Sequence, residues 1–192
     1  MTNIAQDLEA RYSRVNGVRL SMVANSRLQT SGISRSSADV TNSLDRQLLK
    51  HLRSLADIAV TDVATAIAES YRPSKLVELE IWTKSGDARG LEDVSAGEFR
   101  PLRVQQIDDA VVRLQTLRQT HSSILLETGP TVTKVLASAQ EIDEASLTVT
   151  RAADHDTALA SLKTFADRIG LDYLKKIETV WLDQTLFARL AR

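Results

Sequence analysis

Residues of the types that carry out chemistry are sparse in this sequence. It has no Cys, and its three histidines are far apart: His51, His121 and His155. Zinc sites and Cys or His nucleophiles therefore have little to build on. Two aspartates, Asp154 and Asp156, flank His155 and are candidate metal ligands for a hydrolase. The motifs GxxxxGK with Ser or Thr, GxGxxG and GxSxG are absent, and we predict that the chain is not an enzyme.

The charge balance is nearly even, with 24 Lys and Arg against 25 Asp and Glu. A strongly basic protein that coats free nucleic acid as a monomer is therefore excluded, although a local basic groove is not. The length of 192 residues fits one domain with a sizeable core. The polar N-terminus and the lack of about 18 consecutive apolar residues predict a soluble intracellular protein without a membrane partner.

Apolar residues recur at steps of three and four through most of the chain, as is typical of helices. The segments with this period are 4–22, 40–67, 107–125, 132–149, 159–169 and 173–187. Segment 40–67 is either one long helix or two antiparallel helices. We assign the chain to one domain, with a Ser-containing linker at 30–37. Residues 1–36 are an N-terminal extension, 37–175 a helical core and 176–192 a C-terminal helix.

The period changes after Pro73. Leu76 to Trp82 alternate apolar and polar residues, which predicts a strand. Residues 98–104 are predicted to pair back with it as a second short strand, with Pro101 at an edge or a bulge. The expected fold class is therefore all-α: a four-helix-bundle core, a small β-hairpin at about 76–104 and extra helices at both termini.

With the elements in this order, four short patterns resemble the coat proteins of rod-shaped helical plant RNA viruses, the tobamovirus group and its relatives. Two patterns surround the strand: the helix end with Tyr71 and Pro73, and the return strand Phe99 to Arg103. The third is the stretch Ile142 to Val149 on a long helix. The fourth is the spacing of Phe165, Gly170, Leu171 and Tyr173.

The resemblance implies a structural capsid subunit that self-assembles into a helical rod around single-stranded genomic RNA, in the virion and the host cytoplasm. It places a phosphate-binding arginine at Arg118, near the end of the third helix. The other candidate RNA-binding residues are Arg113, Arg151, Lys50 and Arg53. Each of these basic residues could equally lie on a solvated helix face or complement a helix dipole.

The resemblance also implies carboxylates that meet between subunits and repel when ionised, so that assembly depends on protons or on weakly bound calcium. The candidates are Glu69, Asp108, Asp109, Asp143 and Glu144. Ordinary acids at helix ends are the other interpretation. Apart from that calcium, no cofactor or metal is expected, and the partners are other copies of the chain and RNA. The alternative function is a non-viral, all-helical adaptor that binds a protein through an amphipathic face.

Overall fold

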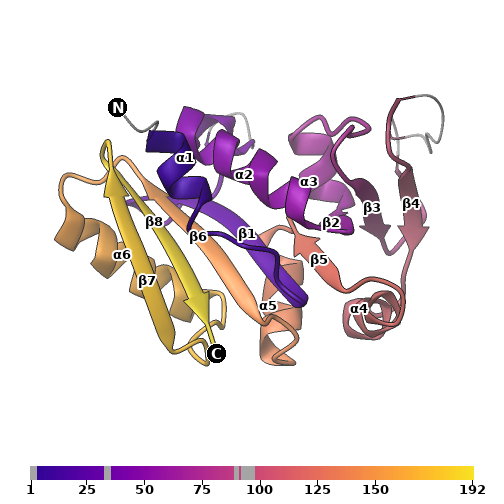
Figure 1. The fold of residues 1–192 in the computed structure, drawn as a ribbon. Coiled ribbons are helices and arrows are strands. Elements are labelled where there is room, and N and C mark those ends of the chain that lie inside the picture. Colours follow the sequence, from indigo (N-terminus) through magenta and orange to yellow (C-terminus); the bar gives the residue numbers. More distant parts are fainter. Residues whose placement is uncertain (1–3, 33–35, 89–90, 92–97) are drawn as a thin grey trace.

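The computed structural model describes residues 4–32, 36–88, 91 and 98–192, without the side chains of residues 4–6. The predicted linker at 30–37 lies partly outside these residues. The fold is α/β, with helices on both faces of an eight-stranded sheet (Figure 1). The prediction of an all-α four-helix bundle is therefore wrong.

Six strands are parallel, and the last two form an antiparallel hairpin at one edge. The strand order is β4-β3-β2-β5-β1-β6-β8-β7. The strands are β1 (Gly17–Asn25), β2 (Ile58–Asp62), β3 (Glu78–Thr83), β4 (Leu102–Gln106), β5 (Ser123–Leu126), β6 (Glu144–Thr150), β7 (Lys176–Leu182) and β8 (Thr185–Ala191). The helices are α1 (Ile4–Glu9), α2 (Ser43–Leu55), α3 (Val63–Ala68), α4 (Ala110–Arg118), α5 (Pro130–Ser138) and α6 (His155–Arg168), with a 3-10 turn η1 (Ser37–Asp39). None of these helices, in the part of the chain that is described, has the length and apolar character needed to cross a membrane.

Each face of the sheet has its own apolar core. Val18 and Leu20 of β1 belong to the core that packs against α4, α5 and α6. The opposite face packs against α1, α2 and α3, and Leu48 and Leu52 of α2 are buried there. Figure 1 shows the two helical layers on either side of the sheet. Because both faces are covered, β2 and β5 bury apolar residues on both sides, as is usual in parallel sheets.

This burial explains the error in the predicted helices. Segment 40–67 is α2, β2 and α3, and segment 107–125 contains α4 and most of β5. Strands β2 and β5 have only five and four residues, which is too short, and too uniformly apolar, to display a period of two. Segment 132–149 likewise contains most of α5 and of β6. The spacing of three and four between apolar residues therefore continues from the helices into the buried strands, and the strands were predicted as helix.

Both predicted terminal helices contain strands. Segment 4–22 holds α1 and part of β1, which lies between β5 and β6 in the sheet. The expected C-terminal helix, 176–192, is the hairpin of β7 and β8. Its two turn residues, Asp183 and Gln184, have φ values of 46° and 55°, and positive φ at both positions is what a type I′ turn requires. The usual Asn-Gly or Asp-Gly signal for such a turn is missing here.

The alternation from Leu76 to Trp82 does predict a strand correctly, because β3 occupies this segment. The predicted partner strand also exists, as β4, but the two strands are parallel, with Leu79 opposite Leu102. Parallel neighbours need a crossover connection and cannot form a hairpin. The expected hairpin at 76–104 is therefore wrong. β4 is an edge strand that begins directly after Pro101.

Candidate functional site

A large cleft opens where the parallel strands end. It is lined by the C-terminal ends of β2, β3 and β5, the middle of β1, helices α2 and α3, and the starts of α4 and α5. Its volume is about 1660 Å³, above the roughly 300–1,000 Å³ usual for a ligand pocket. In open α/β sheets, ligands bind beyond the carboxyl ends of the strands. The cleft is therefore the candidate site.

A buried carboxylate, Glu127, directly follows β5 in the cleft. Arg53 of α2 donates from Nε to Glu127 Oε1 at 2.7 Å and from Nη2 to Oε2 at 2.5 Å. The hydroxyl of Tyr71 also donates to Oε2, and the Arg53 guanidinium lies 5.1 Å from the centre of the Tyr71 ring. Burial, and then the charge of Glu127, raises the pKa of Tyr71 well above its usual value. Tyr71 is therefore a permanent donor that helps to fix the carboxylate.

Asp45 is a second carboxyl group in the cleft, in the first turn of α2. It is half-buried, and its Oδ2 accepts a 2.6 Å hydrogen bond from the hydroxyl of Thr41. The loss of surrounding water raises the pKa of Asp45, and hydrogen bonds from Thr41 and Thr148 oppose that rise only in part. Asp45 therefore keeps a proton to higher pH than an exposed aspartate does.

Asp62, at the end of β2, connects two helix N-termini. As the N-cap of α3, it accepts a hydrogen bond from the amide N–H of Thr65 at 2.9 Å. Its Oδ2 also accepts from the N–H of Gly129, at 2.6 Å, where α5 begins. A Cβ atom at Gly129 would lie 3.0 Å from Thr65 Oγ1 and 3.3 Å from Asp62 Oδ2, so this close approach favours glycine. The starts of α3 and α5 thus adjoin in the cleft.

Cationic side chains line the rim of the cleft. Arg46 and Lys50 lie four residues apart on α2 and share one face of that helix. Lys75 follows α3, and Lys84 follows β3. Acidic side chains line the same cleft, and Lys75 is paired with Glu98, so the cations offer local contacts for an anionic group and no uniform positive field.

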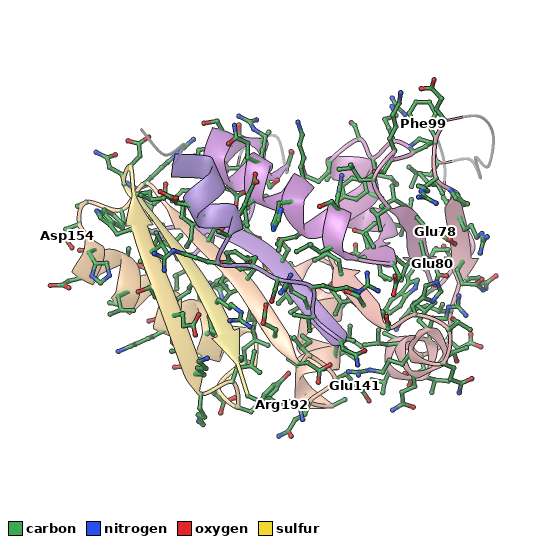
Figure 2. The ribbon with its side chains drawn as sticks, viewed as in Figure 1. Glu78, Glu80, Phe99, Glu141, Asp154 and Arg192 are labelled. Carbon is green, nitrogen blue, oxygen red and sulfur yellow. The ribbon has the colours of Figure 1, made fainter. Side chains whose placement is uncertain are left out.

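The arginines of α4 that were predicted to bind RNA are engaged by acidic partners. Arg113 donates two hydrogen bonds to Glu80 of β3, at 2.8 and 2.5 Å. Arg118 donates to the carbonyl of Glu141 at 2.6 Å and to Asp143 Oδ2 at 2.9 Å. Figure 2 shows Glu80 and Glu141 well apart, the first beside β3 and the second below β6. These two arginines therefore tie α4 to separate parts of the fold.

Of the other three basic candidates, two lie together on α2 and line the cleft, and the third lies elsewhere. Arg53 is held by Glu127, and Lys50 lines the cleft. Arg151 is exposed in the turn after β6, with a φ of 56°. The five basic residues predicted from the sequence therefore do not share one groove.

Most carboxylates predicted to meet between subunits have partners within this chain. Asp109 is the N-cap of α4 and accepts from the first N–H groups of that helix. Asp143 accepts from an N–H of β1 at 2.9 Å, and Glu69 accepts from the hydroxyl of Ser36 at 3.0 Å. Glu69, Asp108 and Asp109 all line the cleft. Their placement indicates capping and loop contacts inside one molecule.

Glu144 is part of a buried ionic cluster on the sheet, away from the cleft. Its Oε1 accepts from Arg19 Nε at 2.6 Å, and its Oε2 accepts from Arg189 Nε at 2.7 Å. The side chains of Arg19 and Glu144 are only 5% and 4% exposed. Burial lowers the pKa of Arg19, and the charge of Glu144 offsets that effect only in part. This cluster joins β1, β6 and β8.

The residues on which the coat-protein resemblance rested have local roles. Tyr71 binds Glu127, and Pro73 lines the cleft. Phe165 is buried in the core on the α6 side of the sheet. Gly170 follows α6 with a φ of 83°, a conformation that ends helices. The Tyr173 hydroxyl donates to a backbone carbonyl before β6 at 3.0 Å.

The candidate metal ligands of a hydrolase do not converge. Asp154 is the N-cap of α6, while Asp156 Oδ1 lies 3.4 Å from His155 Nδ1. Within the ranges that the structure describes, no group of three or more His, Cys, Asp or Glu is arranged to hold a metal ion. The hydrolase option has no support from this geometry.

Of three residues of the cleft, Asp45 and Asp62 were not singled out from the sequence, and Glu127 was considered only as a further carboxylate between subunits. A signal for two of them was present. Asp62 ends the run that begins at Ile58, and Glu127 directly follows the apolar run that ends at Leu126. A polar residue at the end of a short apolar run is what a buried parallel strand carries to its ligand-binding edge. This signal requires the runs to be recognised as strands.

Comparison of the sequence with models of protein families gave no match, and comparison with curated proteins gave none either. Solved structures do resemble it. A pyrimidine reductase-like protein from Corynebacterium diphtheriae has a TM-score of 0.63 and 16% identity, over 92% of this chain and 91% of that one. The riboflavin biosynthesis reductase Rib7 of Saccharomyces cerevisiae has a TM-score of 0.58 and 9% identity, over 94% and 91%. A dihydrofolate reductase from Enterococcus faecalis, complexed with NADP(H), has a TM-score of 0.52 and 12% identity, over 94% and 98%.

At these identities the likenesses show the fold alone, and they overturn the resemblance to rod-virus coat proteins. That resemblance rested on patterns of a few residues each, which an α/β chain reproduces by chance. A helical capsid subunit and an all-helical adaptor both need a fold that this chain does not have, so RNA packaging and a place in the virion are withdrawn. The expectations of a non-enzyme and of no cofactor are also corrected, because the similar structures are reductases and one contains NADP(H).

Proposed function

We propose that this protein is a reductase that binds a nicotinamide dinucleotide and a nitrogen heterocycle side by side in the cleft. One observation carries the proposal: the same cleft is lined by a carboxyl group with a raised pKa, Asp45, and by a carboxylate fixed by an ion pair, Glu127. Solved proteins with this fold are named as pyrimidine reductase-like and as dihydrofolate reductase, and these names favour a nitrogen heterocycle as substrate.

Several features of the cleft fit a nicotinamide dinucleotide. Its volume of about 1660 Å³ leaves room for two ligands. The first N–H groups of α5, at Thr131 and Val132, lie at the cleft, and such groups bind phosphates. Val63 and Val135 also line this region, and Val135 is 49% exposed, which suits a planar ring. Asp62, whose carboxylate accepts a hydrogen bond from the N–H of Gly129 at the start of α5, opposes a phosphate there.

Glu127 is well suited to orient the substrate. Its Oε1 accepts one hydrogen bond and its Oε2 accepts two. A carboxylate has about four acceptor positions, so one remains on Oε1 for an N–H or amino group of a heterocycle. Because Arg53 and Tyr71 hold the carboxylate, this acceptor points in a fixed direction, as precise positioning of a substrate requires.

Asp45 is the group that we assign as proton donor. Reduction of a C=N bond needs a proton at nitrogen in addition to the hydride that a reduced nicotinamide supplies when bound. Because burial raises the pKa of Asp45, its carboxyl group holds a proton to higher pH than an exposed aspartate does, as a proton donor requires. Thr41 donates to Asp45 Oδ2 and so fixes the orientation of the carboxyl group.

The test is oxidation of NADPH and of NADH by the purified chain in the presence of a panel of aminopyrimidines and dihydropteridines. At least one substrate should be reduced, and Glu127→Gln and Asp45→Asn should each lower kcat/KM by about 10²-fold or more. Asp154→Asn, which changes the N-cap of the distant helix α6, should leave turnover unchanged. Absence of turnover, together with no binding of either dinucleotide at millimolar concentration, would contradict the proposal.

A further inference from the structure

We propose that Asp62 restricts binding of the dinucleotide, because its carboxylate occupies the position at the start of α5 that a pyrophosphate would take. The inference rests on the proposed function and concerns the same cleft. It assigns to Asp62 the role of setting the cofactor affinity.

The carboxylate of Asp62 is held firmly in this position. It accepts hydrogen bonds from the N–H of Gly129 at 2.6 Å, from the N–H of Thr65 at 2.9 Å and from the Thr65 hydroxyl at 3.0 Å. Two of these donors are the backbone N–H groups at the starts of α5 and α3. Asp62 thus already satisfies, with a full negative charge, donors that would otherwise be open to a phosphate oxygen.

The start of α5 has few other donors. Its first residue is Pro130, which has no N–H. The next donors are the N–H groups of Thr131 and Val132, one and two residues further into the helix. A pyrophosphate that reaches them must lie close to Asp62, or Asp62 must give up the N–H of Gly129. Either outcome weakens binding, because two anions held close repel each other.

The charge of Asp62 is not balanced by a cation. In the part of the chain that the structure describes, no Lys or Arg forms an ion pair with Asp62, whereas arginines bind Glu80, Glu127 and Glu144. Asp62 is also half-buried rather than fully solvated. Its field is therefore weakly screened toward an anion in the cleft.

The substitution that isolates this effect is Asp62→Asn. Asparagine is as good an N-cap as aspartate, so α3 keeps its cap while the negative charge disappears. NADPH should then bind about tenfold more tightly or better, since the removed repulsion acts at short range. Reduced nicotinamide mononucleotide, which lacks the pyrophosphate, should show a smaller gain than NADPH.

The matched control is Asp154→Asn. Asp154 is also an N-cap and accepts a hydrogen bond from the N–H of Thr157 at 2.7 Å. The substitution Asp154→Asn therefore removes one negative charge from an N-cap, as Asp62→Asn does. In Figure 2 Asp154 lies beside α6, at the opposite side of the molecule from α3 and β3. Its substitution should leave the affinity for NADPH unchanged. Asp62→Ser, which also caps a helix without charge, serves if Asp62→Asn does not fold.

Binding is measured by energy transfer from tryptophan to the reduced nicotinamide and by calorimetry, without turnover. Tighter binding to Asp62→Asn or Asp62→Ser, but not to Asp154→Asn, supports the role of Asp62. If the parent chain binds NADPH and the Asp62 variants bind it no better, this inference is overturned while the proposed function stands. Equal gains in the Asp62 and Asp154 variants would also overturn it, as a general charge effect. If neither the parent nor any variant binds a dinucleotide at millimolar concentration, the proposed function fails as well.

Discussion

Arg53 and Glu127 form a two-bond ion pair that joins α2 to the end of β5. The side chain of Glu127 is 4% exposed and that of Arg53 is 20% exposed. Removal of Arg53 therefore leaves a carboxylate without its partner in a poorly hydrated position. The pair holds together two elements that line the cleft, so its effect is on stability as well as on the site.

We expect Arg53→Met to lower the free energy of unfolding by about 3 kcal/mol or more. Tyr71→Phe removes one hydrogen bond to the same charged group and should cost about 1.5–3 kcal/mol. Urea denaturation of the three proteins measures both changes. A loss below about 1 kcal/mol for Arg53→Met, as for a surface ion pair, would contradict the importance of this pair.

The strand β3 was predictable because its residues alternate, and the break at Gly129-Pro130 was predictable because proline favours the first turn of a helix. The sheet itself was not. β6 alternates Ala145, Leu147 and Val149 with polar residues, but Ala145 and Val149 also continue the steps of three and four that begin in α5. With both faces of the sheet covered, periodicity in single segments did not separate strand from helix.

The cleft could not be predicted because its residues meet only through the strand order. Asp62 is the last residue of β2 and Gly129 lies shortly after β5, and these strands pair in parallel with Val60 opposite Leu126. That register places the two residues within hydrogen-bond distance. The sequence shows both residues at the end of a strand or in a turn. No local sequence pattern, however, predicts that β2 and β5 pair with each other in the sheet.

The raised pKa of Asp45 gives a pH dependence with a definite sign. A proton donor must be protonated, so kcat/KM should fall as pH rises through the raised pKa of Asp45. Asp45→Asn should lose about 10²-fold or more in kcat/KM and should no longer show this limb of the pH profile. A profile that is unchanged in Asp45→Asn would show that another group titrates.

Asp45 also affects stability with the opposite sign to an ordinary salt-bridged aspartate. Its folded-state pKa lies above the unfolded value of about 3.9, so its contribution to stability is present at low pH and lost as pH rises through the folded pKa. Asp45→Asn should therefore be as stable as the parent at neutral pH, or more stable, even though it is inactive. Thermal unfolding at neutral pH checks this, with destabilisation as the contrary result.

The buried cluster around Glu144 should be the most sensitive ionic site. Glu144→Gln leaves Arg19, with a side chain that is 5% exposed, without its charged partner. We expect a loss of about 3–5 kcal/mol in the free energy of unfolding. A double variant, Arg19→Met with Glu144→Met, should recover most of that loss, because no charge is then left buried. Equal stability of Glu144→Gln and the parent would contradict this account.

Asp57 should control the stability of the protein in acid. It lies at the start of β2, where Arg14 Nη2 is 2.6 Å from its Oδ1 and the N–H groups of Ser122 and Ser123 donate to its Oδ2 at 3.0 Å. The hydrogen bond from Arg14, followed by the amide of Ser123, lowers the pKa of Asp57 to about 2. Because this value is below the unfolded one of about 3.9, the contribution of Asp57 to stability is present above pH ~4 and lost as pH falls toward ~2.

Asp57→Asn should therefore be less stable than the parent at neutral pH, and the difference in stability should shrink between pH ~4 and pH ~2. Urea midpoints of both proteins, measured at a series of pH values, test this. A stability difference between the two proteins that stays constant from neutral pH down to pH ~2 would contradict this prediction. It would mean that the charge of Asp57 does not contribute to stability.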